Sequence, residues 1–547
     1  FGVRYGRATA GRLEVKTRDP NDKRLHVVAD LNLYHATALV EGPVSDTVSV
    51  AVAARRSYVD AVLNAAQSSF PEEAPGFTVA PRYYDYQAKV TWKAGAHDTL
   101  RLNLFGSDDE MKMVGVQTGG LEDIDAINFA TRFGVLGLSW DHQPSPQTRL
   151  NVSLSESILR TEAKVGGFFN DKETYAITGL RLEGSHEVLP SLRLSAGIDS
   201  RILPWGHLDL SVPPIPSPNE IYVDAEPNHY DKTLAAVEVG GWVEAVWKPL
   251  PSVTIVPGVR FDYENFIFEG WWFDPRLAAR WTLVEGTTVK GGVGLYHQPP
   301  PIAYATEDWG NPDLGAEGSW QYSLGVEQRI WGPLSADVQL YYKDMFDLSL
   351  PNNRVITRGG ELVPERYSNE GTGSAYGAEL LLRYDPDGRF SGWIAYSLSK
   401  SKRDQSVVGG TFYANGDDFD QPHNLTALGT LELPEIWNGL SVGFRLRYST
   451  GNPYRKYVRS IYDVDTDSYQ GIPEAQRSSR MPAFFQLDAR IDKKWTFQTW
   501  TLNAYLDVQN ATNRGNAEQV VYAHDYSESG YATGMPIFPS IGLRGEY

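Results

Sequence analysis

Apolar and polar side chains alternate with a period of two in one segment of this chain after another. Residues 440–448 place Leu, Val, Phe, Leu and Tyr on one side and Ser, Gly, Arg and Arg on the other. The ranges 334–342, 376–384, 485–492 and 500–508 repeat this pattern. Because successive side chains of a strand point to opposite faces, each segment predicts a β-strand with one apolar and one polar face.

These segments are longer than the strands of an ordinary soluble β-sandwich. Strands of soluble sheets usually contain about 5–6 residues. A tilted strand needs about 9–11 residues to cross the hydrocarbon core of a membrane, and many segments here reach or exceed that length. Aromatic residues at the segment ends are typical of the interfacial girdles of a transmembrane barrel.

Alternately short and long connections predict an antiparallel up-and-down barrel with tight periplasmic turns and long extracellular loops. Long loops are expected near 59–82, 109–125, 207–229, 298–317, 351–366, 405–420 and 457–480. We predict 22 strands, at 24–33, 35–41, 46–58, 83–94, 98–108, 126–142, 147–164, 173–188, 192–206, 230–248, 252–266, 271–283, 287–297, 318–331, 333–350, 367–385, 389–404, 421–434, 439–456, 483–494, 499–524 and 535–547. The strand at 499–524 is expected to run unbroken through 510–515.

The composition agrees with an all-β transmembrane barrel. Aromatic residues make up 12% of the 547 residues, apolar residues only 41%, and the mean hydropathy is −0.36. No stretch approaches the roughly 18 consecutive apolar residues of a transmembrane helix. Since only every second residue of a barrel strand faces lipid, low average hydropathy is expected for a barrel.

Charge and cysteine content restrict the function further. The formal net charge is −18 and cysteine is absent. Nucleic-acid binding requires clustered Lys and Arg to release counterions, so we exclude nucleic acid as a partner. The absence of cysteine removes disulfides, zinc fingers and thiol catalysis. A cationic or metal-bearing ligand is compatible with the negative charge.

No catalytic constellation is present in the sequence. The ten His residues are scattered, and neither HExxH nor GxSxG occurs. Carboxylate pairs fall mostly in the expected loops, where solvation is the usual environment. We therefore expect no enzymatic activity and no cofactor, with one calcium site as the exception to consider.

That site lies in an expected extracellular loop. Three aspartates lie at alternate positions, and a glutamate stands at the twelfth position counted from the first of them. This pattern resembles the oxygen ligands of a calcium loop. Ser468 stands where such a loop requires glycine, so a solvated acidic loop is the alternative. The candidate calcium ligands are Asp463, Asp465, Asp467 and Glu474.

The segment 266–273 is unusually aromatic. It fits an interfacial girdle, because aromatic belts are general in barrels. The alternative is an apolar platform for a ligand at the barrel mouth. The candidate ligand-binding residues are Trp271, Trp272, Phe273, His297, Tyr304 and Trp309.

Several motifs carry a family resemblance. They are Tyr5–Gly11 followed by Leu13–Arg18, Asn311–Leu314, Gln321–Glu327, Ala375–Leu380, Phe419–Leu425, Gly451–Tyr454, Asp507–Asn513 and Pro539–Arg544. In order and placement they resemble the barrel of TonB-dependent receptors of the bacterial outer membrane. The resemblance spans nearly the whole chain.

The resemblance implies two parts. Residues 1–23 correspond to the C-terminal end of the family's plug, and residues 24–547 to the barrel. We expect the chain to begin within a mature protein and to lack the rest of the plug, which is either cleaved off or supplied by a separate chain. Several charged residues are expected to face the lumen, where they fit either a plug interface or a solvated barrel wall. They are Glu379, Arg383, Arg445, Arg447 and Asp488.

The implied function is uptake of a large, scarce nutrient of the ferric siderophore, cobalamin, glycan or peptide class. Energy would come from the TonB complex through the plug. Outer-membrane lipids and lipopolysaccharide are further expected partners. The alternatives are a passive or separately plugged pore, including one for protein export, and a structural barrel within an envelope complex.

Overall fold

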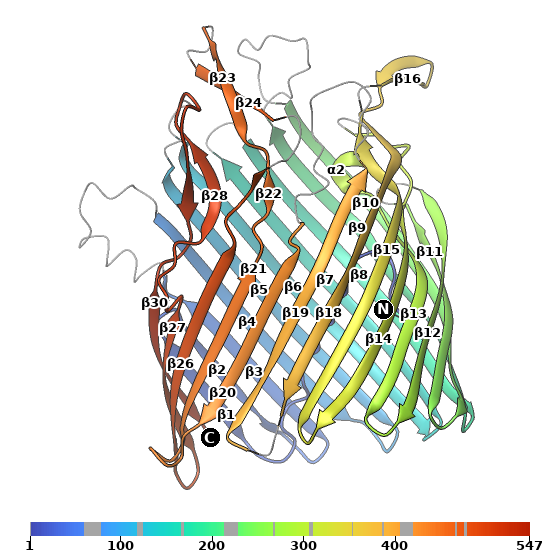
Figure 1. Ribbon diagram of the computed structural model, residues 1–547. Helices are drawn as coiled ribbons and strands as arrows, with labels where there is room; N and C mark the ends of the chain where they lie inside the picture. Colours follow the sequence, from blue (N-terminus) through green and yellow to red (C-terminus); the bar gives the residue numbers. More distant parts are fainter. Residues whose placement is uncertain are drawn as a thin grey trace.

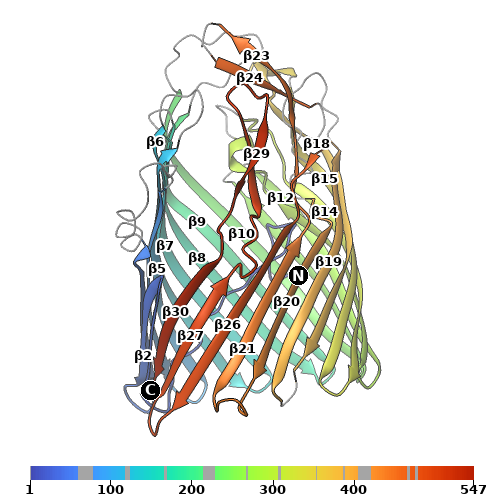
Figure 2. The same cartoon turned by 60° about the vertical axis from the view of Figure 1, so that its left-hand side comes forward.

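Twenty-two antiparallel strands form one closed sheet in the computed structural model of this chain (Figures 1 and 2). Each strand pairs with the next along the wall, and the ring closes where β1 pairs with β30, from Val28 opposite Glu546 to Asn32 opposite Gly542. The structure describes residues 2–59, 78–116, 124–165, 169–212, 228–265, 269–305, 310–352, 354–385, 388–404, 420–464, 468–474 and 479–547. The predicted barrel and its strand number are confirmed.

The wall strands lie close to the predicted segments. They are β1 (His26–Asn32), β2 (His35–Pro43), β3 (Val48–Ser57), β4 (Thr78–Lys93), β5 (Asp98–Val116), β6 (Ile124–Ser145), β7 (Thr148–Val165), β8 (Phe169–Leu189), β9 (Leu192–Val212), β10 (Asn228–Leu250), β11 (Val253–Glu264), β12 (Gly270–Val284), β13 (Thr287–Gln298), β14 (Glu317–Trp331), β15 (Leu334–Pro351), β18 (Tyr367–Tyr384), β19 (Phe390–Asp404), β20 (His423–Glu432), β21 (Leu440–Ser449), β26 (Phe484–Thr496), β27 (Thr501–Gln509) and β30 (Phe538–Glu546).

Burial follows the alternation that the sequence shows. Leu136, Leu154 and Leu324 are 50%, 48% and 59% exposed on the outer face, where membrane lipid covers apolar side chains. By contrast, Arg260 and Asp262 are almost completely buried. The molecule is therefore apolar outside and charged inside, the reverse of a soluble domain.

Short turns join the strands at one end of the barrel, where the C-terminus also lies (Figures 1 and 2). The turn between β12 and β13 contains Gly286, whose φ of 85° lies in the left-handed region. Glycine adopts that region without the steric penalty of a side chain. This tight turn fixes the direct pairing of Thr282 with Thr288 next to it.

Four small two-stranded sheets rise from the opposite end of the barrel (Figures 1 and 2). They are β16 (Val355–Arg358) with β17 (Glu361–Pro364), β22 (Pro453–Tyr454) with β25 (Ser479–Arg480), β23 (Tyr457–Asp463) with β24 (Ser468–Pro473), and β28 (Ala517–Tyr522) with β29 (Ser529–Thr533). The described residues also contain one short helix, α2 (Ile302–Ala305). No helix among them is long and apolar enough to cross a membrane.

The prediction of an unbroken strand over 499–524 was wrong. Strand β27 ends at Gln509, because Asn510 has a φ of 48°. The Asn510 side-chain amide donates hydrogen bonds to the carbonyl oxygens of Arg514 and Met535, at 2.9 and 3.0 Å. Asparagine tolerates the left-handed conformation, and its side chain here replaces the lost ladder bonds. The wall strand predicted over 439–456 likewise ends early, at Ser449.

Some wall strands extend beyond their predicted ends. Strand β5 continues to Val116 and β9 to Val212, into ranges predicted to be loops. Strand β10 contains 23 residues, about twice what a membrane crossing requires. The barrel wall therefore projects beyond the membrane on this side, with its outward face carrying polar and charged groups there.

Candidate functional site

Residues 2–24 contain no strand and lie inside the barrel, along the inner wall (Figure 1). We call residues 2–24 the inner segment. Its start contacts β8 to β13, where Arg4 Nε donates to Glu183 Oε1 at 2.6 Å. Its end contacts β2 to β5, where Lys89 Nζ donates to the carbonyl oxygen of Thr17 at 3.0 Å. The inner segment therefore bridges two parts of the wall, and β1 begins directly after it.

A buried charge cluster holds the start of the inner segment. Arg7 forms ion pairs with three wall carboxylates: Asp199, Glu238 at 3.2 Å (Nε–Oε2) and Asp262 at 2.8 Å (Nη1–Oδ1). These carboxylates project from β9, β10 and β11. Buried charges are stable only when they are paired, so Arg7 is part of the charge balance of the wall itself.

Arg260 of β11 completes this cluster from the wall side. Its guanidinium donates to Asp199 Oδ2 at 2.8 Å and to Asp262 Oδ1 at 2.6 Å. Gly6 lies directly against it, since a Cβ at Gly6 would overlap with Nε of Arg260. The absence of a side chain at Gly6 thus allows the backbone to approach the charged wall.

A second cluster lies on β12 and β13. Arg276 Nη1 donates to the carbonyl oxygens of Gly2 and Tyr5, at 2.8 and 2.6 Å. Arg276 is also paired with the buried Asp274, at 3.0 Å. Asp274 Oδ1 lies 2.7 Å from Nδ1 of His297. His297 is therefore connected to the inner segment through one carboxylate and one arginine.

The end of the inner segment is anchored by exposed and half-buried ion pairs. Asp19 Oδ1 lies 2.9 Å from both Lys89 Nζ and Arg101 Nε. Hydrogen bonds from Arg101, with a further one from Lys89, hold the pKa of Asp19 well below its usual range. Arg18 reaches Glu41 at 2.5 Å (Nη2–Oε1), and Asp22 reaches Lys93 at 2.6 Å (Oδ2–Nζ).

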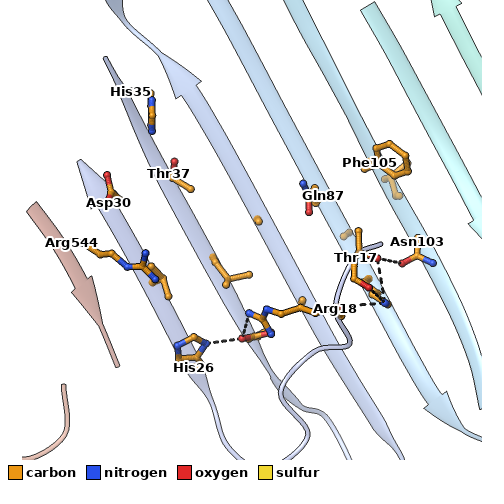
Figure 3. A pocket seen from close by; sticks show the side chains of 18 of the residues that line it. Thr17, Arg18, His26, Asp30, His35, Thr37, Gln87, Asn103, Phe105 and Arg544 are labelled. Atoms are coloured by element: carbon orange, nitrogen blue, oxygen red, sulfur yellow. Dashed lines mark hydrogen bonds and ion pairs between the residues drawn. The ribbon is translucent and has the colours of Figure 1, made fainter. Parts of the chain in front are cut away.

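A cavity of about 630 Å³ opens beside this end of the inner segment. Figure 3 shows Thr17 and Arg18 of the inner segment beside side chains of β1, β2, β4 and β5. Its lining combines apolar side chains with polar and charged ones, which include Arg18, Asp30, His35, Gln87, Asn103 and Arg544. Its volume falls in the range of small-molecule sites, and it belongs to the aqueous interior of the barrel.

The predicted aromatic ligand residues divide between the two faces of the wall. Trp272 is buried on the lumen side, and its ring centroid lies 6.4 Å from that of His297. Trp271 and Phe273 are 62% and 57% exposed on the outer face. Tyr304 of α2 stacks on Tyr367 at 4.2 Å. Trp309 lies outside the described residues.

The five predicted plug-facing residues all project into the lumen from β18, β21 and β26. Arg445 and Asp488 are direct cross-strand partners and form an ion pair at 2.6 Å. Within the described chain, none of the hydrogen bonds or ion pairs of Glu379, Arg383, Arg445, Arg447 and Asp488 reaches the inner segment. They form a separate part of the wall, and their contact with a plug stays a prediction.

The candidate calcium ligands are not brought together where the structure describes them. Asp463 is at the tip of the β23–β24 hairpin, opposite Ser468, while the Glu474 amide bonds to Lys456 at its base. Six strand residues separate tip and base by about 20 Å. Asp465 and Asp467 lie outside the described residues. The described residues contain no group of three or more His, Asp or Glu suited to a metal ion.

The inner charge cluster was not anticipated from the sequence. The available signal was the spacing of Arg260 with Asp262, and of Asp274 with Arg276, two residues apart within apolar strands. That spacing places both charges of each pair on the lumen face. The binding partner of these charged wall residues could not be predicted from the strands alone, because the inner segment lies more than 190 residues away in sequence.

Comparison with known proteins gives one family. Residues 63–511 match the family described as TonB dependent receptor-like, beta-barrel. No curated protein matches the sequence.

Solved structures with the same fold share little sequence. The ferric-catecholate import receptor Fiu from E. coli K12 is 12% identical, with 97% of this chain and 82% of that chain covered and a TM-score of 0.67. The ferric yersiniabactin uptake receptor FyuA from Yersinia pestis is 12% identical, with 97% and 80% covered and a TM-score of 0.70. The FrpB iron transporter from Neisseria meningitidis is 14% identical, with 96% and 82% covered and a TM-score of 0.66. The chain is therefore a bacterial outer-membrane protein and belongs to the TonB-dependent receptors.

Proposed function

We propose that this barrel imports a large, scarce nutrient across the outer membrane, with a ferric chelate as the first ligand class to test. The observation that carries the proposal is the inner segment, which the wall holds through buried charges around Arg7. An importer needs a lumen that is occupied at rest and can be cleared when energy is supplied. Ion pairs suit this use, because their partners become hydrated when they separate.

The similar structures support the ligand class. The names of Fiu, FyuA and FrpB refer to a ferric-catecholate receptor, a ferric yersiniabactin receptor and an iron transporter. Cobalamin, glycans and peptides are the other classes to test, since one fold supports many ligands. The net charge of −18 agrees with a metal-bearing ligand but does not select one.

In this proposal the chain's own residues bind ligand and gate the lumen, and they perform no chemistry on the ligand. Residues 1–23 are assigned to the plug, through which the TonB complex acts. The wall residues Asp199, Glu238 and Asp262 hold Arg7 at rest. Force on the plug would separate these pairs and widen the lumen. Trp272, buried on the lumen side beside His297, is the aromatic side chain that we assign to contact with a passing ligand.

Uptake of radiolabelled iron separates this function from the alternatives. A strain lacking the gene is complemented with the whole receptor, and ⁵⁵Fe uptake from a panel of ferric siderophores is measured with and without TonB. We expect uptake of at least one chelate that requires both proteins. Uptake independent of TonB would indicate a passive pore, and loss of envelope integrity without loss of uptake would indicate a structural barrel.

A matched pair of variants tests the role of the lumen. Trp272→Ala should lower uptake, whereas Trp331→Ala should leave it unchanged, because Trp331 is 61% exposed beside the short turn at the start of β15. Equal uptake by both variants would remove Trp272 from the ligand path.

A further inference from the structure

Strands β12 and β13 are neighbours in the wall (Figure 1), but their backbone pairing stops short of their upper ends. Their last ladder pair is Arg276 with Gly294, although both strands continue beyond it within the described part of the chain. Pro275 stands where the pairing ends, and proline cannot donate a ladder hydrogen bond. We call the two unpaired stretches, residues 270–275 and 295–298, the upper joint.

Each of these two stretches is still paired on its other side. Strand β12 pairs with β11 up to Gly270, which lies opposite Glu264. Strand β13 pairs with β14 up to Gln298, which lies opposite Glu317. Two continuous parts of the wall therefore meet at the upper joint. The interruption between them leaves backbone donors and acceptors that other groups have to satisfy.

Two side chains of β12 take the place of the missing backbone bonds. Asp274 Oδ2 accepts from the backbone N–H of His297 at 3.4 Å, and Arg276 Nε donates to the carbonyl oxygen of Leu295 at 3.4 Å. Both bonds are longer than the usual value of about 2.9–3.0 Å. The short contact joins two side chains, Asp274 Oδ1 and His297 Nδ1, at 2.7 Å. Since an ionised carboxylate only accepts, Nδ1 carries the proton.

The same two side chains of β12 are tied to the inner segment. Arg276 gives its shortest hydrogen bonds to the carbonyl oxygens of Gly2 and Tyr5, at 2.8 and 2.6 Å, and not to β13. Its side chain is 5% exposed and pairs with the fully buried Asp274 at 3.0 Å. Withdrawal of the inner segment would leave this buried guanidinium without two partners. An unsatisfied buried charge costs more than a long hydrogen bond such as the one to Leu295 contributes.

We propose that Asp274 and Arg276 form a latch, which keeps the upper joint closed while the inner segment is in place and releases it when the inner segment withdraws. Both are positioning residues, because they act through His297 and Leu295 and not on a ligand. Opening separates His297 from Trp272, whose ring centroid lies 6.4 Å away. Trp272 is 7% exposed at rest, so opening makes it accessible. The trigger rests on the proposed function, in which the plug moves during import.

Spin labels on the outer face measure the upper joint in the purified full chain. The chain contains no cysteine, so Phe273→Cys/Leu295→Cys carries labels only across this joint. Val293→Cys/Tyr322→Cys is the reference, because these two residues are direct partners on the continuous ladder of β13 and β14. Dipolar broadening of the nitroxide spectra gives the fraction of molecules in which the labels of each pair have moved apart.

Two variants release opposite ends of the inner segment. Arg7→Ala acts on its start without touching the upper joint, since Arg7 pairs with residues of β9, β10 and β11. Arg18→Ala is the control, because Arg18 pairs with Glu41 at the other end. We expect Arg7→Ala to increase the fraction of open joints by about fivefold or more, as is usual for two coupled sites. Arg18→Ala should leave the joint closed, and the reference labels should not move in either variant.

Hydrogen exchange of residues 2–6 is measured on the same samples. A closed joint in Arg7→Ala, with residues 2–6 released, would overturn the proposal. Movement of the reference labels together with the joint labels would also overturn it, because that result would indicate a general loosening of the wall.

A double variant tests the latch directly if Arg7→Ala leaves the inner segment bound. Asp274→Asn/Arg276→Met removes both charges together, and replacing a buried ion pair by uncharged side chains of similar size is often tolerated. This variant should open the joint and speed exchange at residues 2–6, and an unchanged joint would contradict the latch. If it fails to fold, Arg7→Ala decides. None of these measurements uses a ligand or TonB, so the latch and the import function can fail independently.

Discussion

Arg7 of the inner segment and Asp262 of β11 form an ion pair at 2.8 Å (Nη1–Oδ1), and the Asp262 side chain is fully buried. The same carboxylate accepts hydrogen bonds from Arg260. Two arginines from distant parts of the sequence thus meet at one wall carboxylate. The contact binds the lumen's occupant through buried charge, in addition to the apolar packing of Val3 against the wall at Gly258.

Replacing Arg7 by alanine should release the start of the inner segment. The change leaves Asp199, Glu238 and Asp262 with less positive charge around them, and breaking a buried pair typically costs about 3–5 kcal/mol. Hydrogen exchange of residues 2–12 should become fast, while the wall strands stay protected. Arg12→Ala is the control, because Arg12 lies over the Tyr5 ring and is not among the Arg7 pairs. Unchanged protection in Arg7→Ala would show that the cluster does not hold the segment.

Gly6→Ala should displace the same region by a steric route. A Cβ at Gly6 would overlap with Arg260, whereas a Cβ at Gly11 would meet no atom within 4 Å. Overpacking of this kind costs about 1–3 kcal/mol, so Gly6→Ala should expose residues 2–12 to protease and Gly11→Ala should not. Equal cleavage of the two variants would contradict the close approach at Arg260.

Acid should release the end of the inner segment. The pKa of Asp19 is lowered chiefly by hydrogen bonding to Arg101, so the ionised form stabilises docking. A depressed folded-state pKa contributes stability that is complete above the unfolded value, about 4, and is lost as pH falls below it. A fluorophore near residue 20 should therefore report constant docking from pH 8 to 5 and release at lower pH. Asp19→Asn should already show the released signal at pH 7.

The barrel could be predicted from sequence because strand alternation is local information. The alternation within a segment such as 440–448 is sufficient to show which of its side chains face lipid. The short turns then determine which strands are neighbours. The end of β27 was missed because the strand-like residues 517–522, which follow the polar run 510–516, were interpreted as a continuation of the same strand. The turn at Asn510 depends on its contacts with Arg514 and Met535, and Met535 is not adjacent in sequence.

The site was less predictable, because its contacts join residues far apart in the chain. Trp271 and Trp272 were grouped as one aromatic platform, although strand parity places them on opposite faces. His297 was selected as a lone histidine, and the structure shows its partner to be Asp274. The pairing of Arg7 with three wall carboxylates could not be derived from any local pattern.

The two neighbouring tryptophans provide the last prediction. Trp271 packs between Phe261 and Tyr263 on the outer face, with ring centroids at 4.8 and 4.2 Å. Trp271→Ala should therefore lower the stability of the barrel by about 0.5–1.5 kcal/mol for each lost aromatic pair, without changing ligand affinity. Trp272→Ala should lower ligand affinity, because Trp272 is buried on the lumen side near His297. Urea unfolding in lipid vesicles and a binding titration with the imported chelate measure the two effects. If Trp271→Ala weakened binding and Trp272→Ala did not, the ligand platform would lie on the outer face of β12, which is incompatible with transport through the lumen.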